Sequence, residues 1–314
     1  MSSEDIVSVS IPMHVSGFWV PIIRNDYLSS GSLGAGLTLK PKASFAIRRS
    51  TKERICTLKL NDTCLDNLPL VNVINEVLDI KRLNVKIIGK SLGSLGAGLG
   101  LSASVAIAYS LAAILDRFGE VPTLNRAGAI AHVAEVKCLT GLADVIAEIY
   151  GGGLVIRIAP GAPGVGVIDV LPIKDNVVVL ITFMDPLLKS RVTTPQMLID
   201  RLKYFYRVGM EAYSKFIKNP TLENFLEVSR MFSESVGFLR GKVRDVITNV
   251  LNPFMKRGDV IGYYVKKSIL LTVVNKYGYD KIIEALRSTG LNTLVASIST
   301  SGTQVFHGGR YENT

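Results

Sequence analysis

Three oxygen-bearing side chains, Ser102, Glu135 and Asp144, lie in the least charged part of the chain. A hydroxyl group and a carboxylate are ligands that Mg²⁺ accepts, and a second carboxylate can take up a proton. Transfer of a phosphoryl group to an alcohol needs such a metal site, a base and a cradle for phosphates. Taken singly, Ser102 is equally well explained as an N-cap, Glu135 as a helix-surface acid and Asp144 as a cap of the next helix.

A glycine-rich run leads directly into Ser102. Glycines keep side chains off the backbone, and the first turn of a helix offers unpaired N–H groups and the positive end of its dipole. This pattern predicts a loop that holds nucleotide phosphates, although glycine-rich turns also precede buried helices in proteins that bind no ligand. The predicted phosphate-binding residues are Gly96, Ala97, Gly98, Leu99, Gly100, Leu101, Ser102, Ala103 and Ser104.

The segment after Ser102 is strongly apolar, and no charged residue occurs in the 25 residues from Ser91 to Leu115. Only about 15 of them follow a helical pattern, and at about 1.5 Å per residue they fall short of a hydrocarbon core about 30 Å thick. We therefore expect a buried central helix and no membrane span.

The composition of the chain argues against several classes of protein. The 314 residues carry a net charge of +10, but the basic residues are spread along the chain, which argues against nucleic-acid binding. Three cysteines, Cys56, Cys64 and Cys138, form an odd set without metal-type spacing, which argues against a disulfide framework or a zinc site. The first ten residues show no signal-peptide pattern, so the cytoplasm is the expected location.

The N-terminal part reads as strands joined by turns. Residues 5–11 alternate like a strand, and a turn bracketed by two prolines follows at 12–21, where it can present His14 to a ligand. The heptapeptide GSLGAGL occurs at 31–37 and again at 93–99. Either two glycine-rich loops face one ligand, or the match is chance in a chain with 28 glycines.

The remaining elements indicate an α+β fold. Residues 124–136 follow a helical pattern, and 177–183 form a strand candidate that opens a second domain. Residues 194–286 are mostly helical, with breaks expected at Asn219–Pro220 and Asn252–Pro253, and the chain ends in strands that return to a sheet. The predicted domains are 1–175 and 176–314.

Three motifs resemble those of the GHMP kinases, the family of galactokinase, homoserine kinase and mevalonate kinase. They are PMHVSGF at 12–18, GLGLSASVAIA at 98–108 and STSGTQVF at 299–306. The resemblance spans the chain and implies a ribosomal protein S5 domain 2-like N-terminal domain followed by a ferredoxin-like C-terminal domain. It also implies ATP as the phosphoryl donor, Mg²⁺ bound by Ser102 and Glu135, and Asp144 as the carboxylate that takes the hydroxyl proton.

Two departures from the family pattern bear on residue roles. LSAS at 101–104 stands where many members have SSAA or SGAG, which leaves the role of Ser104 open. The third motif has few small residues, which leaves Gly302 as its position of close approach.

Within this family, several stretches most resemble the archaeal pantoate kinases. They are HVSGFWVP at 14–21, GSLGAG at 31–36, AHVAEVKCLTGLADVIAE at 131–148 and GGLVIRIAPGAPGVGVID at 152–169. This resemblance implies phosphorylation of the 4-hydroxyl group of (R)-pantoate to 4-phosphopantoate, a step of archaeal coenzyme A biosynthesis. The alternatives are a kinase of the homoserine, shikimate or mevalonate type and a non-catalytic nucleotide-binding protein. A homodimer is left open.

No motif identifies the residues that bind the substrate. Arginine is favoured because a guanidinium group binds a carboxylate through two parallel hydrogen bonds. The candidates are His14, Ser16, Gly17, Arg24, Arg157 and Gly302.

Overall fold

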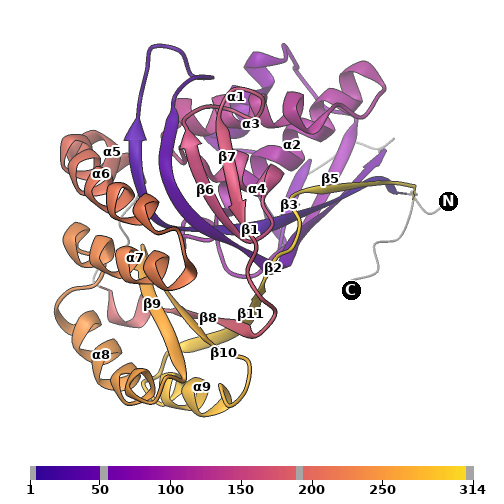
Figure 1. Ribbon diagram of the computed structural model, residues 1–314. Coiled ribbons are helices and arrows are strands. Elements are labelled where there is room, and N and C mark those ends of the chain that lie inside the picture. The colour runs from indigo at the N-terminus through magenta and orange to yellow at the C-terminus, as the bar shows by residue number, and fades with distance from the viewer. Residues whose placement is uncertain (1–4, 50–55, 189–193, 309–314) are drawn as a thin grey trace.

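The computed structural model describes residues 5–49, 56–188 and 194–308. A strongly curled sheet runs through both halves of the molecule, and helices pack against it (Figure 1). Among the described residues the strands are β1 (Asp5–Ile22), β2 (Gly31–Arg49), β3 (Leu58–Leu60), β4 (Thr63–Cys64), β5 (Val85–Lys90), β6 (Leu154–Ala159), β7 (Val167–Leu171), β8 (Val177–Phe183), β9 (Val260–Lys266), β10 (Ile269–Asn275), β11 (Asn292–Ile298) and β12 (Gln304–His307). The helices are α1 (Pro69–Val77), α2 (Leu101–Phe118), α3 (Leu124–Lys137), α4 (Asp144–Tyr150), α5 (Thr194–Asp200), α6 (Leu202–Lys218), α7 (Leu222–Val236), α8 (Gly241–Lys256) and α9 (Asp280–Arg287), with a short 3₁₀ turn η1 (Asp185–Leu187).

The first two strands are much longer than the sequence pattern predicts. β1 continues through residues 12–21, so the expected turn is wrong, and β2 includes 31–37, so that segment is a strand and not a loop. The strands pair antiparallel with irregularities between Ile11 and Met13 and between Ser16 and Phe18. Such bulges re-aim side chains without ending a strand, which explains why the alternation in the sequence breaks here.

The sheet joins the ends of the chain. Its main path is β4-β3-β5-β2-β11-β8-β10-β9, and β12 pairs antiparallel with β1. The predicted return of the C-terminal strand to a sheet is therefore confirmed. Because β12 lies beside β1, residues from the end of the chain complete the N-terminal part. The division into 1–175 and 176–314 stays a prediction.

The region expected to be mostly helical contains a β-hairpin as well. β9 and β10 are joined at Lys267 and Ser268, and Lys267 has φ +55°. Both strands are buried almost throughout, so they lack the polar alternation that marks a half-buried strand. The break expected at Asn252–Pro253 is also wrong, because α8 continues through Pro253.

Helix α2 is the central helix that the sequence predicts, and it is longer than expected at 18 residues. Its length and composition would suffice for a membrane span, so the expectation that it is too short to cross a membrane is wrong. However, 78% of these 18 residues are buried inside the protein, as expected for a core helix. The small side chains Ala106, Ala108 and Ala112 are fully buried and allow neighbouring elements to approach closely.

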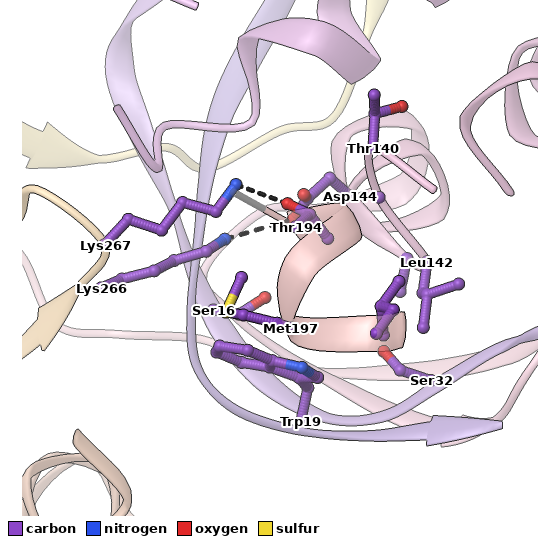
Figure 2. A pocket seen from close by; sticks show the side chains of 13 residues that line it. Ser16, Trp19, Ser32, Thr140, Leu142, Asp144, Thr194, Met197, Lys266 and Lys267 are labelled. Carbon is purple, nitrogen blue, oxygen red and sulfur yellow. Dashed lines mark hydrogen bonds and ion pairs between the residues drawn. The ribbon is translucent and has the colours of Figure 1, made fainter. Parts of the chain in front are cut away.

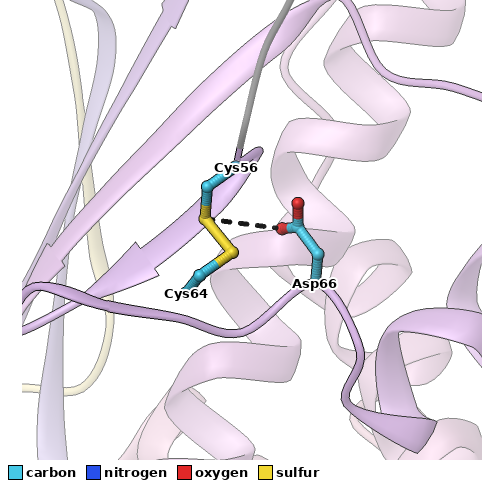
Figure 3. Close-up of side chains that lie close together, drawn as sticks. All are labelled: Cys56, Cys64 and Asp66. Atoms are coloured by element: carbon cyan, nitrogen blue, oxygen red, sulfur yellow. Dashed lines mark hydrogen bonds between the residues drawn. A yellow bond between two sulfur atoms is a disulfide. The ribbon is translucent and has the colours of Figure 1, made fainter.

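The structure corrects the expectation for the cysteines. Cys56 and Cys64 form a disulfide across the β3–β4 hairpin, whereas Cys138 is free (Figure 3). The carboxylate of Asp66 lies beside this bond and accepts hydrogen bonds from the backbone N–H groups of Thr57 and Leu58. Sulfur atoms joined in a disulfide are not thiolates, so Cys56, Cys64 and Asp66 do not form a metal site while the disulfide is present.

Reduction of this disulfide should destabilise the protein. The bond closes a loop between residues 8 positions apart. Chain-entropy arguments then give a loss of about 2–3 kcal/mol in the free energy of unfolding. Urea unfolding with and without a reductant measures the loss. A Cys56→Ser/Cys64→Ser variant should have the stability of the reduced protein, and the reductant should not change it. Cys138→Ser should lose stability on reduction as the wild type does. Equal stability of the reduced and oxidised wild type would show that the bond contributes nothing.

Candidate active site

The glycine-rich loop ends at Gly100, directly before α2, as the sequence predicts. A Cβ atom on Gly96 would meet no atom within 4 Å, so the backbone here is open to a ligand. By contrast, a Cβ on Gly98 would lie 2.9 Å from Lys266 O, and one on Gly100 would lie 2.2 Å from Glu148 Oε1. Gly98 and Gly100 therefore serve close packing of the loop. The side chains of Ala97, Leu99, Leu101 and Ala103 are buried in the core, which leaves only their backbone groups for phosphates.

The two serines at the start of α2 have different partners. Ser102 Oγ lies on a cavity wall and donates to Glu135 Oε2 at 3.3 Å. Ser104 is fully buried and donates to Glu148 Oε2 at 2.9 Å. The other oxygen of Glu148 has no partner in the part of the chain that the structure describes, and burial raises the pKa of this carboxyl well above its usual value. Ser104 thus does not share the position of Ser102.

Glu135 on α3 is a buried carboxylate that lies behind Ser102 and Thr140, two residues of that cavity wall. Thr140 Oγ1 donates to its Oε1 at 2.7 Å, but among the described residues it forms no ion pair. Burial raises its pKa to about 7, against the lowering effect of the hydrogen bond from Thr140. Gly141 permits this arrangement, since a Cβ atom there would lie 2.2 Å from Glu135 Oε2. A buried carboxylate beside a hydroxyl fits a divalent cation.

Asp144, the first residue of α4, contacts a histidine and a lysine from distant parts of the chain. His14 Nδ1 lies 2.6 Å from its Oδ1. Lys266 Nζ lies 3.6 Å from the same atom (Figure 2). Burial alone would raise its pKa, but Lys266, the hydrogen bond from His14 and the charge of Arg157 outweigh burial and hold the pKa below the usual range. The carboxylate is therefore ionised, and its Oδ2 has no partner among the described residues.

The neighbours of His14 determine its tautomer. Arg157 Nη1 lies 3.3 Å from His14 Nε2, and a guanidinium group can only donate, so Nε2 is the acceptor. His14 then carries its proton on Nδ1 and donates it to Asp144. Two glycines of β2 make room for this chain of contacts: a Cβ on Gly36 would lie 2.4 Å from His14 Nε2, and one on Gly34 would lie 2.6 Å from Arg157 Nη2. The repeat of GSLGAGL is thus not a second ligand loop.

His14 should make stability depend on pH. Burial lowers its pKa from 6.5 to about 4. The unfolded chain therefore takes up a proton first as the pH falls, and His14 removes about 1.4 kcal/mol of unfolding free energy per pH unit between 6.5 and 4. Asn in place of His14 keeps an N–H donor for Asp144 and does not titrate.

The difference between wild type and His14→Asn measures this effect, because Glu135, with its raised pKa, has the opposite dependence in both proteins. Urea unfolding at several pH values should show the wild type losing stability relative to the variant below pH 6.5. Parallel profiles would contradict a neutral His14.

Two adjoining cavities lie around these groups. One of about 50 Å³ is lined by Ser16 and Trp19 of β1, by Asp144, by α5 and by Lys266 (Figure 2). The other, of about 340 Å³, is lined by the apolar residues Leu68, Leu70 and Leu95 and also by Gly96 and Ser102. Residues shared by both walls connect the cavities; they are Thr140, Thr194 and Lys267. The larger cavity therefore adjoins the smaller one, which Asp144 lines.

Of the predicted substrate-binding residues, Ser16 alone lines the smaller cavity. Gly17 faces α7, since a Cβ there would lie 2.0 Å from Ser229 Oγ, and Arg24 is exposed and lines neither cavity. Gly302 packs against the end of α4, where a Cβ would lie 2.1 Å from Ile149 O. His14 and Arg157 lie behind Asp144, so they orient that carboxylate.

Two cationic residues of the site escaped the sequence analysis. Lys266 and Lys267 end β9 and begin its turn, and both line the smaller cavity. Lys267 Nζ donates to Thr194 Oγ1 at 2.6 Å (Figure 2). Burial, together with the charge of Lys266, lowers the pKa of Lys267 to about 8. Adjacent lysines between two apolar runs, YYV and ILLTVV, were the available signal of a tight hairpin.

No protein-family model matches the chain. The pantoate kinase of Thermococcus kodakarensis is 32% identical over 248 residues, which cover 77% of this chain and 79% of that protein. The chain belongs to the pantoate kinase family. The pantoate kinase of Methanocaldococcus jannaschii is 29% identical over 243 residues, covering 75% and 82% of the two chains. This family member is thus a small-molecule kinase, which implies the use of ATP.

Solved structures agree with the family. A phosphotransferase related to the coenzyme A biosynthesis pathway superposes with a TM-score of 0.77 at 27% identity, covering 96% of this chain and 98% of the other. A mevalonate-3-kinase from Thermoplasma acidophilum has a TM-score of 0.63 at 13% identity over 98% and 99% of the chains. The predicted GHMP kinase fold is confirmed.

Proposed function

We propose that this chain transfers the γ-phosphoryl group of ATP to the 4-hydroxyl group of (R)-pantoate. The observation that carries the proposal is the junction of the two cavities, where the phosphate loop and Ser102 come within one space of Asp144 and Lys267. The likeness to the Thermococcus pantoate kinase supplies the substrate. The alternatives, a homoserine, shikimate or mevalonate type of kinase and a non-catalytic protein, have less support.

The larger cavity binds the nucleotide. Leu68, Pro69, Leu70 and Leu95 form an apolar wall suited to a flat base. The open backbone at Gly96 and the start of α2 face the phosphates. Lys267, from the β9–β10 turn, adds positive charge where the two cavities meet.

Ser102 and Glu135 hold Mg²⁺. The hydroxyl group and the carboxylate lie 3.3 Å apart, and the carboxylate is buried without a cation partner among the described residues. When bound, this ion offsets negative charge on the phosphates and helps to orient them. Removal of the ion with a chelator is therefore expected to abolish turnover.

Asp144 orients the attacking hydroxyl group. Its Oδ1 is held by His14 and Lys266, so Oδ2 is left to accept a hydrogen bond from the substrate and then its proton. A carboxylate with a lowered pKa is a weak base, so its main contribution is the aim of the hydroxyl oxygen at the phosphorus atom. Lys266 and Lys267 are the cations that line the smaller cavity within the described ranges, and they neutralise the carboxylate of the substrate and the transferred phosphoryl group.

The test is the release of ADP in a coupled assay with ATP, Mg²⁺ and a panel of pantoate, pantothenate, homoserine, shikimate and mevalonate. Turnover on pantoate alone supports the proposal. Turnover on another panel member replaces the substrate while keeping the reaction type, and no turnover on any of them favours the non-catalytic alternative.

A further inference from the structure

A second large cavity lies away from the candidate active site, at the junction of β2 and β11 where Ser297 pairs with Lys40. Its volume is about 740 Å³, within the range of small-molecule sites. It shares no lining residue with the two cavities described above. The lining comes from four strands and from the segments that flank β5 and β12.

The walls of this cavity are cationic and rich in hydroxyl groups. The described lining residues include two lysines, four serines and Gln304, but no carboxylate; the lysines are Lys40 and Lys42, and the serines are Ser44, Ser91, Ser297 and Ser301. Lys40 is partly buried, and its side-chain ammonium group has no hydrogen-bond or ion-pair partner among the described residues. A partly buried ammonium group is usually paired with a negative charge. The lining of this cavity supplies none, so an anionic ligand would complete it.

Lys42 is held by neutral groups only. Its Nζ donates to Ser301 Oγ and Gly302 O at 2.8 Å and to Gln304 Oε1 at 3.0 Å, which uses all three of its protons. Burial, together with the charge of Lys40, lowers the pKa of Lys42 to about 8. An anion in the cavity would offset the cost of keeping Lys42 charged.

The acceptors of Lys42 belong to the loop that buttresses the catalytic helix. Thr303, in the same loop, donates through its N–H and its Oγ1 to Glu148 O at 2.9 and 3.0 Å. Glu148 lies in α4, the helix that begins at Asp144. A charged acceptor near Lys42 makes a stronger hydrogen bond than a neutral one, so it competes with the loop for this side chain.

We propose that this cavity binds a small phosphate-bearing anion, which inhibits the kinase by drawing Lys42 away from the loop Ser301–Gln304 and loosening the support of α4. The inhibitory part rests on the proposed kinase function. The binding part does not, because it follows from the lining residues alone.

Pyrophosphate is the probe, and isothermal titration is performed with the nucleotide cavity saturated by a non-hydrolysable ATP analogue. The intact chain should bind pyrophosphate saturably, and Lys40→Gln should weaken binding about 10-fold or more. Lys281→Gln, a change of an exposed lysine on α9, serves as the matched control and should bind like the wild type. Absence of saturable binding, or equal affinity in Lys40→Gln, overturns the proposal.

Rates are then measured with Mg²⁺ in fixed excess, so that chelation affects all proteins equally. Pyrophosphate should slow the wild type and Lys281→Gln more than Lys40→Gln, whose rate without pyrophosphate should equal that of the wild type. Equal inhibition of all three proteins, or binding without inhibition, overturns the effector role. A wild type that binds pyrophosphate but never phosphorylates pantoate would contradict the proposed function and leave the anion site standing.

Discussion

Asp144→Asn should lower turnover by about 100-fold or more, the scale expected when a catalytic carboxylate is lost, while ATP affinity changes little. The amide can still accept a hydrogen bond from His14, so the geometry at the start of α4 is retained. It cannot take up the proton of the substrate hydroxyl group, and it leaves the charge of Lys266 without its partner. Steady-state rates measure the first effect, and calorimetry with a non-hydrolysable ATP analogue measures the second.

Asp280→Asn is the matched control for this variant. Asp280 is likewise the first residue of a helix, α9, but it is exposed and lines neither cavity. It should therefore retain the wild-type rate. If Asp144→Asn turned over as fast as this control, Asp144 would have no part in the reaction.

Glu135→Gln should raise the Mg²⁺ concentration needed for half-maximal turnover by at least about 10- to 100-fold, the range in which weaker perturbations of metal sites already fall. Gln has nearly the same shape: its amide oxygen can accept the hydrogen bond from Thr140, and its amide nitrogen can donate to the Ser102 hydroxyl group in place of the bond that Glu135 accepts. It supplies no negative charge to a divalent cation, so metal affinity changes more than packing does. A magnesium titration of the coupled assay measures the shift.

The exposed Glu284 of α9 supplies the control, since Glu284→Gln removes one negative charge far from the cavities. Its magnesium curve should overlay that of the wild type. A Glu135→Gln curve that overlaid both would remove Glu135 from the metal site.

Several features of the candidate site could be predicted from local sequence patterns. The glycine-rich loop before α2 was predictable because a glycine-rich run before a helix has a local physical meaning. The pairing of Ser102 with Glu135 was expected from the resemblance to the GHMP kinases. The position of Asp144 at the start of a helix was predictable because short polar residues favour helix N-termini. The structure places Ser102 and Asp144 on the walls of adjoining cavities, and it places Glu135 behind that wall, in hydrogen-bond contact with Ser102.

His14, Arg157 and Gly302 show where a residue type alone misleads. A histidine and an arginine near polar motifs suggested contact with an anionic substrate, yet both are buried and line neither cavity. The buried pair serves Asp144, and Gly302 serves the packing of α4. Whether a polar side chain faces a ligand or another side chain depends on strand register, and the bulges of β1 set that register.

The α+β class, the central helix, the glycine-rich loop and the resemblance to GHMP kinases could be predicted from the amino-acid sequence, because they depend on periodicity and on motifs that are continuous along the chain. The β9–β10 hairpin, the disulfide and the cations of the site could not be predicted, because they depend on contacts between distant segments of the folded chain. Lys266 lies 122 positions after Asp144 and reaches it across the interior of the protein. Such contacts are made by buried strands whose uniform apolar pattern carries no local sign of their partners.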